Sequence, residues 1–176
     1  NSKKYRHISA DKLFAIENFN MKNGTISSNL EKTPKWVVIF LKKKFLKYKK
    51  KFNCSSKVFI DRSDSKFIHF SIKNYKDTKV FFEKKGFRFY KLSNLSFYNQ
   101  IYLFNNAKII IGPHGAGFSN LAFCKKNTKV FEFLPKNESH RNVYKKICKF
   151  IKVKHNKVIT RFDKNYQIYL NLNLIK

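Results

Sequence analysis

Apolar and polar positions along the chain follow two different repeats. Short runs of β-branched and aromatic residues predict buried strands, because these side chains suit the crowded faces of a sheet. Longer stretches with an apolar residue every three or four positions predict helices with one buried side. The predicted strands are residues 57–61, 87–92, 109–111 and 129–134, with shorter strands at 153–160 and within 166–174. The predicted helices are residues 35–51, 73–85, 96–104, a short one that begins near Phe118, and 137–150.

Strands and helices alternate between residues 57 and 150. This order predicts an α/β fold in which a mostly parallel sheet has helices on both faces, because parallel strands need long crossover connections. Right-handed crossovers bring the carboxyl ends of the strands to one edge of the sheet. We expect this domain to span residues 34–176. Residues 1–33 lack clear periodicity and are expected to form an arm or the remnant of a preceding domain.

The helix at residues 35–51 is amphipathic and begins directly after Pro34, a favoured position for proline. Lysines form its polar side. We expect its apolar stripe to pack on the sheet, because an indole and its apolar neighbours need burial. A basic amphipathic helix also suits an anionic membrane surface, so peripheral membrane contact is the alternative. The stripe consists of Trp36, Val37, Phe40, Leu41 and Phe45.

The segment 108–124 combines a strand, a glycine turn and a helix. Gly112 is expected to end the strand, and Gly115 and Gly117 flank Ala116 in the turn. Bare backbone N–H groups in such a turn, together with the dipole of the following helix, attract phosphate oxygens. The same pattern is also common as plain architecture, and its glycine spacing differs from the dinucleotide fingerprint. The turn is therefore one candidate for an anion site.

Polar side chains at the strand ends are further candidates. His114 lies within the glycine turn, where it faces a ligand or bonds a backbone carbonyl. Arg62 follows the strand 57–61, and its guanidinium can bind a phosphate with two hydrogen bonds or pair with a neighbouring acid. Glu132 interrupts an apolar strand, so its carboxylate needs a partner, either a sugar hydroxyl pair or a protein amide or lysine. These three side chains are expected to converge at one edge of the sheet.

Other polar residues beside these candidates have two interpretations each. Asp61 and Asp64 flank Arg62 and act either as general bases or as members of a local charge network. Asn120, in the first turn of the helix after the glycines, can reach a ligand, although a single amide proves little. We keep Asp64 and Asn120 as predicted substrate contacts.

The chain has 39 lysine and arginine residues against 10 aspartate and glutamate residues, which gives a net charge of +29. This excess favours an anionic partner, and a basic polyanion-binding or nucleic-acid-binding protein is our alternative prediction. The lysines are scattered, however, and no nucleic-acid motif accompanies them. Aromatic residues fall at core spacing and form no stacking row. We therefore expect a mostly solvated basic surface and no nucleic acid as a partner.

Cysteine and histidine spacing predicts neither a disulfide framework nor a metal site. Cys54, Cys124 and Cys148 lie far apart and are odd in number, which fits free thiols in a reducing compartment. The predicted location is accordingly the cytoplasm, and the inner face of the membrane is the alternative. No apolar run of the sequence is long enough to span a bilayer. Three histidines share no ligand spacing with acids or cysteines. These are His69, His140 and His155.

The candidate residues lie in segments that resemble glycosyltransferase family 61, which includes plant xylosyltransferases, extracellular O-linked N-acetylglucosamine transferases and bacterial capsular-polysaccharide enzymes. The similar segments are VFIDRSDS at 58–65, LSFYNQIYLFNNAKIIIGPHGAGFSNLAFC at 95–124 and TKVFEFLP at 128–135. They occur in order, and the glycine-histidine-glycine block is specific to this group. Phe118 stands where the family usually has an aliphatic residue.

The resemblance implies an inverting glycosyltransferase with a GT-B-like arrangement, in which two Rossmann-like halves face a cleft. This chain resembles the carboxyl-terminal, donor-binding half, a Rossmann-like domain of three layers. The expected donor is a UDP-sugar, and the expected acceptor is a glycan in cell-surface polysaccharide biosynthesis such as capsule. No metal cofactor is expected. Because the acceptor-binding half is largely absent, a catalytically incomplete donor-binding module is a further alternative.

The resemblance also assigns roles to residues. Arg62 and His114 are expected to contact the donor diphosphate, and the backbone amides of 115–117 to hold phosphate. Glu132 is expected to bind a donor hydroxyl. We assign catalytic roles to His114 and Arg62, and substrate binding to Gly112, Gly115, Ala116, Gly117, Asn120, Glu132 and Asp64.

Overall fold

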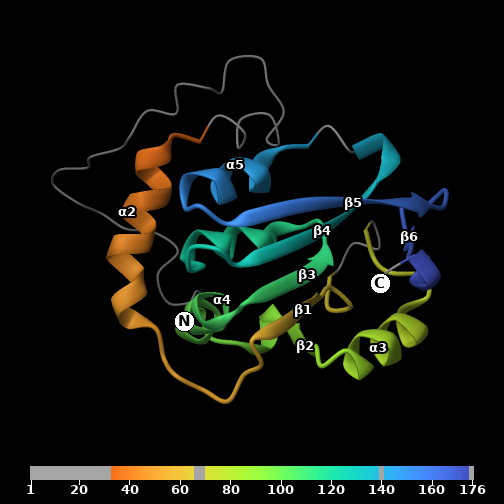
Figure 1. Ribbon diagram of the computed structural model, residues 1–176, viewed down its shortest axis with the longest axis horizontal. Coiled ribbons are helices and arrows are strands. Elements are labelled where there is room, and N and C mark those ends of the chain that lie inside the picture. The colour runs from red at the N-terminus through yellow and green to blue at the C-terminus, as the bar shows by residue number, and fades with distance from the viewer. Residues whose placement is uncertain (1–32, 66–69, 139–140, 175–176) are drawn as a thin grey trace, which may run out of the picture.

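The computed structural model describes residues 33–65, 70–138 and 141–174, so His69, His140 and almost all of the expected arm lie outside the described residues. One six-stranded sheet has the order β2-β1-β3-β4-β5-β6 (Figure 1). The strands are β1 Lys57–Asp61, β2 Arg88–Lys91, β3 Ile109–Pro113, β4 Lys129–Pro135, β5 Lys154–Phe162 and β6 Ile168–Tyr169. The α-helices are α2 Lys35–Phe45, α3 Tyr75–Lys84, α4 Phe97–Asn106 and α5 Val143–Phe150. Short 3-10 helices are η1 Leu46–Tyr48, η2 Leu92–Asn94, η3 Ala116–Phe123, η4 Lys136–Glu138 and η5 Leu172–Leu174.

The sheet is parallel from β2 through β5, and β6 joins it antiparallel, which confirms the predicted α/β class with a mostly parallel sheet. The chain first moves outward from β1 to β2 and then returns to place β3 on the other side of β1. The direction of winding therefore reverses between β1 and β3. Open α/β sheets bind ligands beyond the carboxyl ends of the strands at such a reversal.

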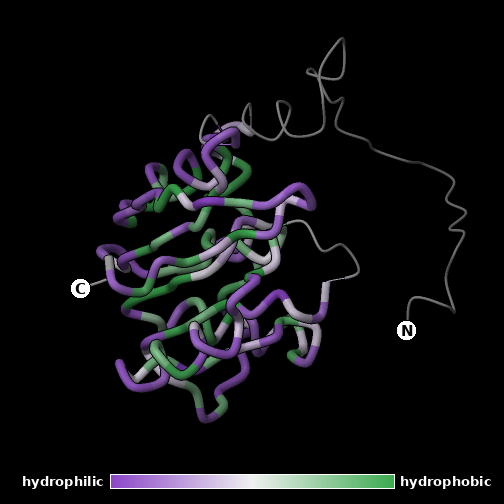
Figure 2. The backbone as a smooth tube through the Cα atoms, turned by 90° about the vertical axis from the view of Figure 1, so that its right-hand side faces the viewer, coloured by the Kyte–Doolittle hydropathy of each residue, from purple (hydrophilic) through white to green (hydrophobic). Residues whose placement is uncertain are grey.

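Each face of the sheet has its own apolar core. Alternate strand residues such as Ile60 and Ile110 pack with α2, α4, η3 and α5 on one face. Their neighbours, such as Phe59 and Ile111, pack with α3 and the segment around Ile168 on the other face. Both faces are thus covered, as the near-continuous apolar strands require. Figure 2 shows the hydrophobic stretches in green along the strands at the centre of the molecule.

Helix α2 lies along one side of the molecule, opposite α3, and packs against α5 and η3 (Figure 1). Its packing side contains Val38, which is 3% exposed, and Phe45. The expectation that the whole apolar stripe is buried is wrong, because Trp36 and Phe40 are 55% and 54% exposed. These two residues lie on the helix face opposite Val38, since a helix turns 100° per residue.

Several predicted boundaries also differ from the structure. β3 does not end at Gly112 but continues to Pro113, and the helix after the glycine turn is a 3-10 helix rather than an α-helix. The predicted helix 137–150 is instead the short η4 and the separate α5 in the described residues. Within 166–174, only β6 is a strand in the described part of the chain.

Candidate functional site

A cavity of about 250 Å³ opens where β1 and β3 end, at the reversal in strand order. Its floor combines the turn after β1 with the glycine bend after β3. Both segments are brought together because β1 and β3 are paired in parallel, with Phe59 opposite Ile111. The lining residues are Ile60, Asp61, Arg62, Asp64, Ser65, Leu92, Pro113, Gly115, Ala116, Gly117 and Phe118.

The glycine bend presents backbone N–H groups to this cavity. Gly115 precedes η3, and the Phe118 N–H closes the bend by donating to the Gly115 carbonyl at 2.9 Å. None of the hydrogen bonds found among the described residues uses the N–H groups of Gly115, Ala116 or Gly117. Ala116 is exposed and the two glycines are half-buried, so these donors are not sealed under packed side chains. Such unpaired donors are suited to the oxygens of an anion.

Arg62 lies directly against this bend. Its Nη1 donates a hydrogen bond to the main-chain carbonyl of His114. A Cβ atom added to Gly115 would lie only 2.7 Å from Arg62 Cζ, so glycine is the residue that permits this approach. The structure therefore brings Arg62 and the glycine bend together, as the predicted parallel sheet with its strand ends at one edge implied.

The charge of Arg62 is not neutralised by a carboxylate. No ion pair within 4.0 Å joins it to Asp61 or Asp64 in the described structure, so the alternative of a local ion pair does not hold. Burial lowers the pKa of Arg62, while electrostatic interactions with Tyr144 and Asp64 raise it. A guanidinium remains protonated at neutral pH in spite of such a shift. The cavity therefore has a positive group available for an anion.

His114, Glu132 and His155 form a buried chain of hydrogen bonds beside the bend. His114 Nδ1 bonds Glu132 Oε1, and His155 Nε2 lies 2.8 Å from Glu132 Oε2. The side chains of Glu132 and His155 are 2% and 3% exposed, and that of His114 is 10% exposed. Glu132 thus holds two imidazoles, which are neither the hydroxyl pair nor the amide or lysine considered from the sequence.

The ionisation of Glu132 fixes the orientation of both rings. Burial by itself raises the pKa of this carboxyl group, but hydrogen bonds and electrostatic attraction from the two histidines bring it below its ordinary value. An ionised carboxylate only accepts hydrogen bonds, so His114 Nδ1 and His155 Nε2 are the donors. His114 is consequently left with Nε2 for other partners, and the buried Nδ1 of His155 has no partner among the described residues.

The imidazole of His114 lies apart from the cavity that Arg62 lines. Its ring centroid is 5.5 Å from that of Phe70 and 5.1 Å from that of Tyr144 on α5. Burial, followed by the charge of Glu132, raises the pKa of Tyr144 to about 12, so its hydroxyl is protonated at neutral pH. His114 therefore contributes its carbonyl to Arg62 and its ring to an aromatic, partly enclosed setting.

Other predicted site residues have clear partners. Asp61 accepts hydrogen bonds from the Tyr75 hydroxyl at 2.7 Å and from the Ser63 N–H at 2.8 Å, which gives it a structural position. Asp64 is exposed, lines the cavity and accepts a hydrogen bond from Ser93.

Asn120 and Gly112 do not line the cavity. Asn120 donates to the Gln100 side chain at 2.9 Å. Gly112 lies inside β3, and a Cβ there would be 3.0 Å from both Cβ and the carbonyl oxygen of Ile60. The structure thus places Gly112 between paired strands, outside the cavity, although the sequence suggested that it ends the strand and contacts the substrate.

Sequence reasoning missed His155 and Tyr144 as parts of this site. In the sheet Glu132 lies opposite Lys157, so His155, two residues before Lys157, projects on the same face as Glu132. The sequence signal was a histidine in β5, the neighbour of the strand that contains Glu132. This signal identifies a contact only when the β4–β5 register is known. Among the described residues no group of three or more histidine, cysteine, aspartate or glutamate side chains is arranged to hold a metal ion, and none of their helices is long and apolar enough to cross a membrane.

Known proteins give a second line of evidence, independent of this geometry. A search among curated proteins finds no match. The family model of Glycosyltransferase 61, by contrast, matches residues 5–131, which is more than half of the 176-residue chain and includes Arg62 and the whole glycine bend. A match of this extent assigns the family, and with it an activity that uses a sugar donor and an acceptor. The chain belongs to glycosyltransferase family 61.

Proposed function

We propose that this glycosyltransferase moves a sugar from a UDP-sugar to a glycan acceptor in cell-surface polysaccharide biosynthesis, with inversion at the anomeric carbon. In this proposal the described domain is the donor-binding half of a GT-B-like enzyme. The observation that carries the proposal is the pairing of Arg62 with the unused amides of 115–117 around one cavity at the strand reversal.

The cavity suits the diphosphate of the donor. Its volume of about 250 Å³ is smaller than the roughly 300–1,000 Å³ of pockets that enclose a whole drug-sized ligand, so it suits a charged group rather than a complete nucleotide sugar. Arg62 supplies a fixed positive charge, and the glycine bend supplies neutral N–H donors. Charge-assisted hydrogen bonds from guanidinium to phosphate are among the strongest that proteins make.

The reaction is a single displacement. The acceptor hydroxyl oxygen attacks the anomeric carbon, the bond from that carbon to the diphosphate oxygen breaks, and UDP leaves with the bonding electron pair. Arg62 and the amides stabilise the negative charge that develops on the diphosphate, a role that contributes about 10²–10³ in rate per donor in comparable sites. The acceptor proton passes to a general base.

His114 is the second catalytic residue in this proposal. Glu132 fixes the ring through Nδ1, so Nε2 is the nitrogen that can meet a substrate. Glu132 then acts by positioning His114. The predicted contact of Glu132 with a donor hydroxyl would require one of its carboxylate oxygens to accept hydrogen bonds from both a histidine and the sugar.

Calorimetric titration of UDP into the full chain tests the proposal. We expect binding in the presence of EDTA, because the protein supplies the positive groups itself, and at least a tenfold loss of affinity in Arg62→Ala. Arg161→Ala is the matched control, since it removes one exposed arginine from β5 and should leave UDP affinity unchanged. No heat with any nucleoside diphosphate, or an equal loss in both variants, would contradict the proposed donor site.

A further inference from the structure

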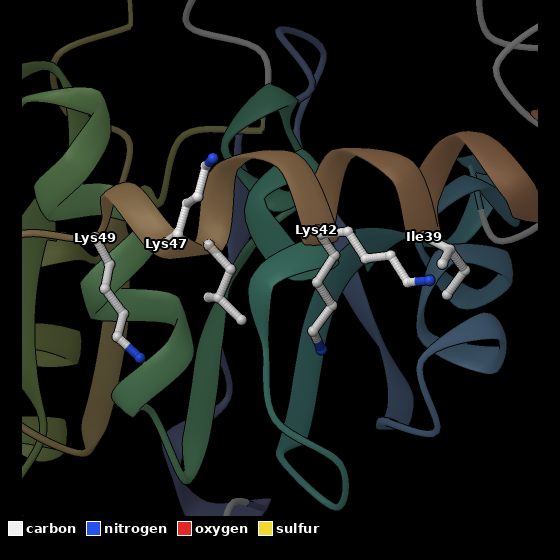
Figure 3. Close-up of a pocket in the computed structure, with 6 residues that line it drawn as sticks. Ile39, Lys42, Lys47 and Lys49 are labelled. Carbon is white, nitrogen blue, oxygen red and sulfur yellow. The ribbon is translucent and has the colours of Figure 1, made fainter.

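The outer face of α2 carries large apolar side chains in contact with solvent. Trp36 and Phe40 are about half exposed, and Lys43 and Lys47 continue the same stripe at helical spacing. Two shallow hollows border these residues and share Ile39 and Lys43: the first includes Trp36 and Phe40, and the second includes Lys47. We call the surface formed by Trp36, Phe40, Lys43, Lys44 and Lys47 the α2 face. Figure 3 shows the second hollow, with Ile39, Lys42, Lys47 and Lys49 labelled.

The face ends in more exposed aromatic residues from η1 and the start of α4. Tyr48 is 46% exposed, and its ring centroid lies 6.3 Å from that of Tyr98, which is 42% exposed. Phe97 is 45% exposed. Exposed apolar residues scattered singly are ordinary, but several of them gathered on neighbouring elements are typical of an interaction surface.

The lysines of this region divide into two groups. Lys42 donates to the Cys124 carbonyl and Lys49 to the Asn105 side chain, so both contribute to the fold. Lys43 and Lys44, by contrast, are exposed and make no hydrogen bond or ion pair with any described residue. Residues 35–51 contain eight lysines and no acidic residue, so no local acid offsets their charge.

This charge selects the kind of partner. A second copy of the chain carries the same +29 and would be repelled. Residues 1–32 contain six basic and three acidic residues, so they too offer no complementary charge. The partner is therefore anionic. A lipid bilayer accommodates an indole and a phenyl ring in its interface while lysines reach its phosphates, and this combination is the one the α2 face presents.

We propose that the α2 face docks on an anionic lipid bilayer, with Trp36 and Phe40 inserted among the headgroups and Lys43, Lys44 and Lys47 on the lipid phosphates. The contact is peripheral and reversible, because its apolar area is small and each lysine adds only a modest electrostatic attraction. It is independent of the proposed sugar transfer and can be tested without it.

The experiment uses Trp36, the single tryptophan of the chain, as its own reporter. The full chain is mixed with vesicles of phosphatidylcholine alone or with about one third phosphatidylglycerol, a composition whose negative surface attracts basic segments. We expect a blue shift of tryptophan emission with the anionic vesicles only, and quenching when their acyl chains are brominated. Emission that is already blue-shifted without lipid, and unchanged by it, would mean that protein covers Trp36 and would overturn the proposal.

Matched charge variants separate this face from the overall charge. Lys43→Gln, Lys44→Gln and Lys47→Gln together should weaken co-sedimentation with anionic vesicles about a hundredfold, or about fivefold per lysine. The control combines Lys76→Gln, Lys84→Gln and Lys164→Gln, which removes the same charge from exposed positions away from α2. Equal losses in both triple variants, or quenching by DNA with none by brominated lipid, would contradict a docking role for the α2 face.

Discussion

Glu132 positions two histidines of the candidate site through its carboxylate. Its carboxylate lies between His114 and His155, and both of its oxygens are used. A buried charge is tolerated when it is hydrogen-bonded in this way, and the same bonds fix the two rings. The residue that holds the site together is thus one that sequence reasoning had considered for direct contact with the sugar.

The first prediction at this scale concerns Glu132→Gln and pH. Because the folded-state pKa of Glu132 lies below the ordinary value of 4.5, the folded protein binds fewer protons than the unfolded chain. The carboxylate therefore stabilises the fold above that pH, and this stabilisation is lost as pH falls through the folded-state pKa. We expect Glu132→Gln to lower the free energy of unfolding by about 2 kcal/mol at neutral pH, with a smaller difference in acid.

Urea unfolding of both proteins between about pH 3 and pH 7 measures this difference. Glu83→Gln is the control, because Glu83 is an exposed partner of Lys79 and its loss should change the free energy by less than about 0.5 kcal/mol. A gap between wild type and Glu132→Gln that stays constant down to the acid limit would refute the linkage.

The second prediction concerns Gly115→Ala. The added methyl group would meet the Arg62 guanidinium, which must then leave the His114 carbonyl. The φ of Gly115 is 165°, an extended value that alanine adopts freely, so the fold should lose less than about 1 kcal/mol. Under the proposed function UDP affinity should fall about tenfold, because the guanidinium proposed to bind phosphate loses its position.

Titration of UDP into the variants checks this prediction, and a double-mutant cycle sharpens it. In an Arg62→Ala background, Gly115→Ala should cause no further loss, because its effect passes through the guanidinium. Additive losses would show that the methyl group acts on the ligand directly.

At the scale of elements, β1, β3 and the bend after β3 place the site. Ile110 and Ile111 enter opposite cores, which fixes the strand against both layers. Gly112 then lets β3 approach Ile60 on β1 closely enough that any side chain would collide. The paired strands end side by side, and the bend follows without a wide loop between them.

Helix α4 packs in the same apolar core as Ile110 of β3, and its N-terminal cap gives a prediction at the same scale. The Ser96 hydroxyl accepts the Asn99 N–H at 3.2 Å and caps the helix, which carries the buried residues Ile101, Leu103 and Phe104. Ser96→Ala should lower the free energy of unfolding by about 1 kcal/mol, because one helix donor loses its partner. Ser96→Asp, which also caps helices, should remain near wild type in the same denaturant titration. Similar losses in both variants would argue against the cap.

The sequence allowed the shared edge of the candidate residues to be predicted, but not the hydrogen-bond partner of each one. Alternating strands and helices implied that Arg62 and His114 share an edge, and the structure confirms that they meet. The acceptor for Arg62 is a main-chain carbonyl, however, which residue types do not reveal. The contact between His155 and Glu132 depends on the β4–β5 register, which residue types do not reveal. The exposure of Trp36 depends on which elements cover α2, because periodicity identifies an apolar face but not the element that packs against it.

At the scale of the whole molecule, charge is the dominant feature. The net charge of +29 is spread over a chain with few acids, and exposed pairs such as Lys79 with Glu83 are rare among the described residues. Repulsion among like charges opposes the compact state and is screened by salt. The same field draws anions toward the cavity and the α2 face.

This balance predicts that salt stabilises the protein. Raising sodium chloride from about 20 mM to about 300 mM shortens the Debye length well below the molecular size and should raise the melting temperature by about 3 °C or more, equivalent to about 1 kcal/mol. Scanning calorimetry with sorbitol at matched osmolality separates screening from solute exclusion. A melting temperature that falls with salt would show that attractive pairs outweigh repulsion.

The anchoring of Arg62 on the carbonyl of residue 114 has one more consequence. Every amino acid has a main-chain carbonyl, so no substitution of His114 removes the acceptor of the Arg62 hydrogen bond. His114→Ala therefore removes the ring and spares the guanidinium, while Arg62→Ala does the opposite. The two parts of the candidate site can therefore be tested separately by mutation, and the contact between Arg62 and the glycine bend tolerates any side chain at position 114 as long as the backbone conformation is kept.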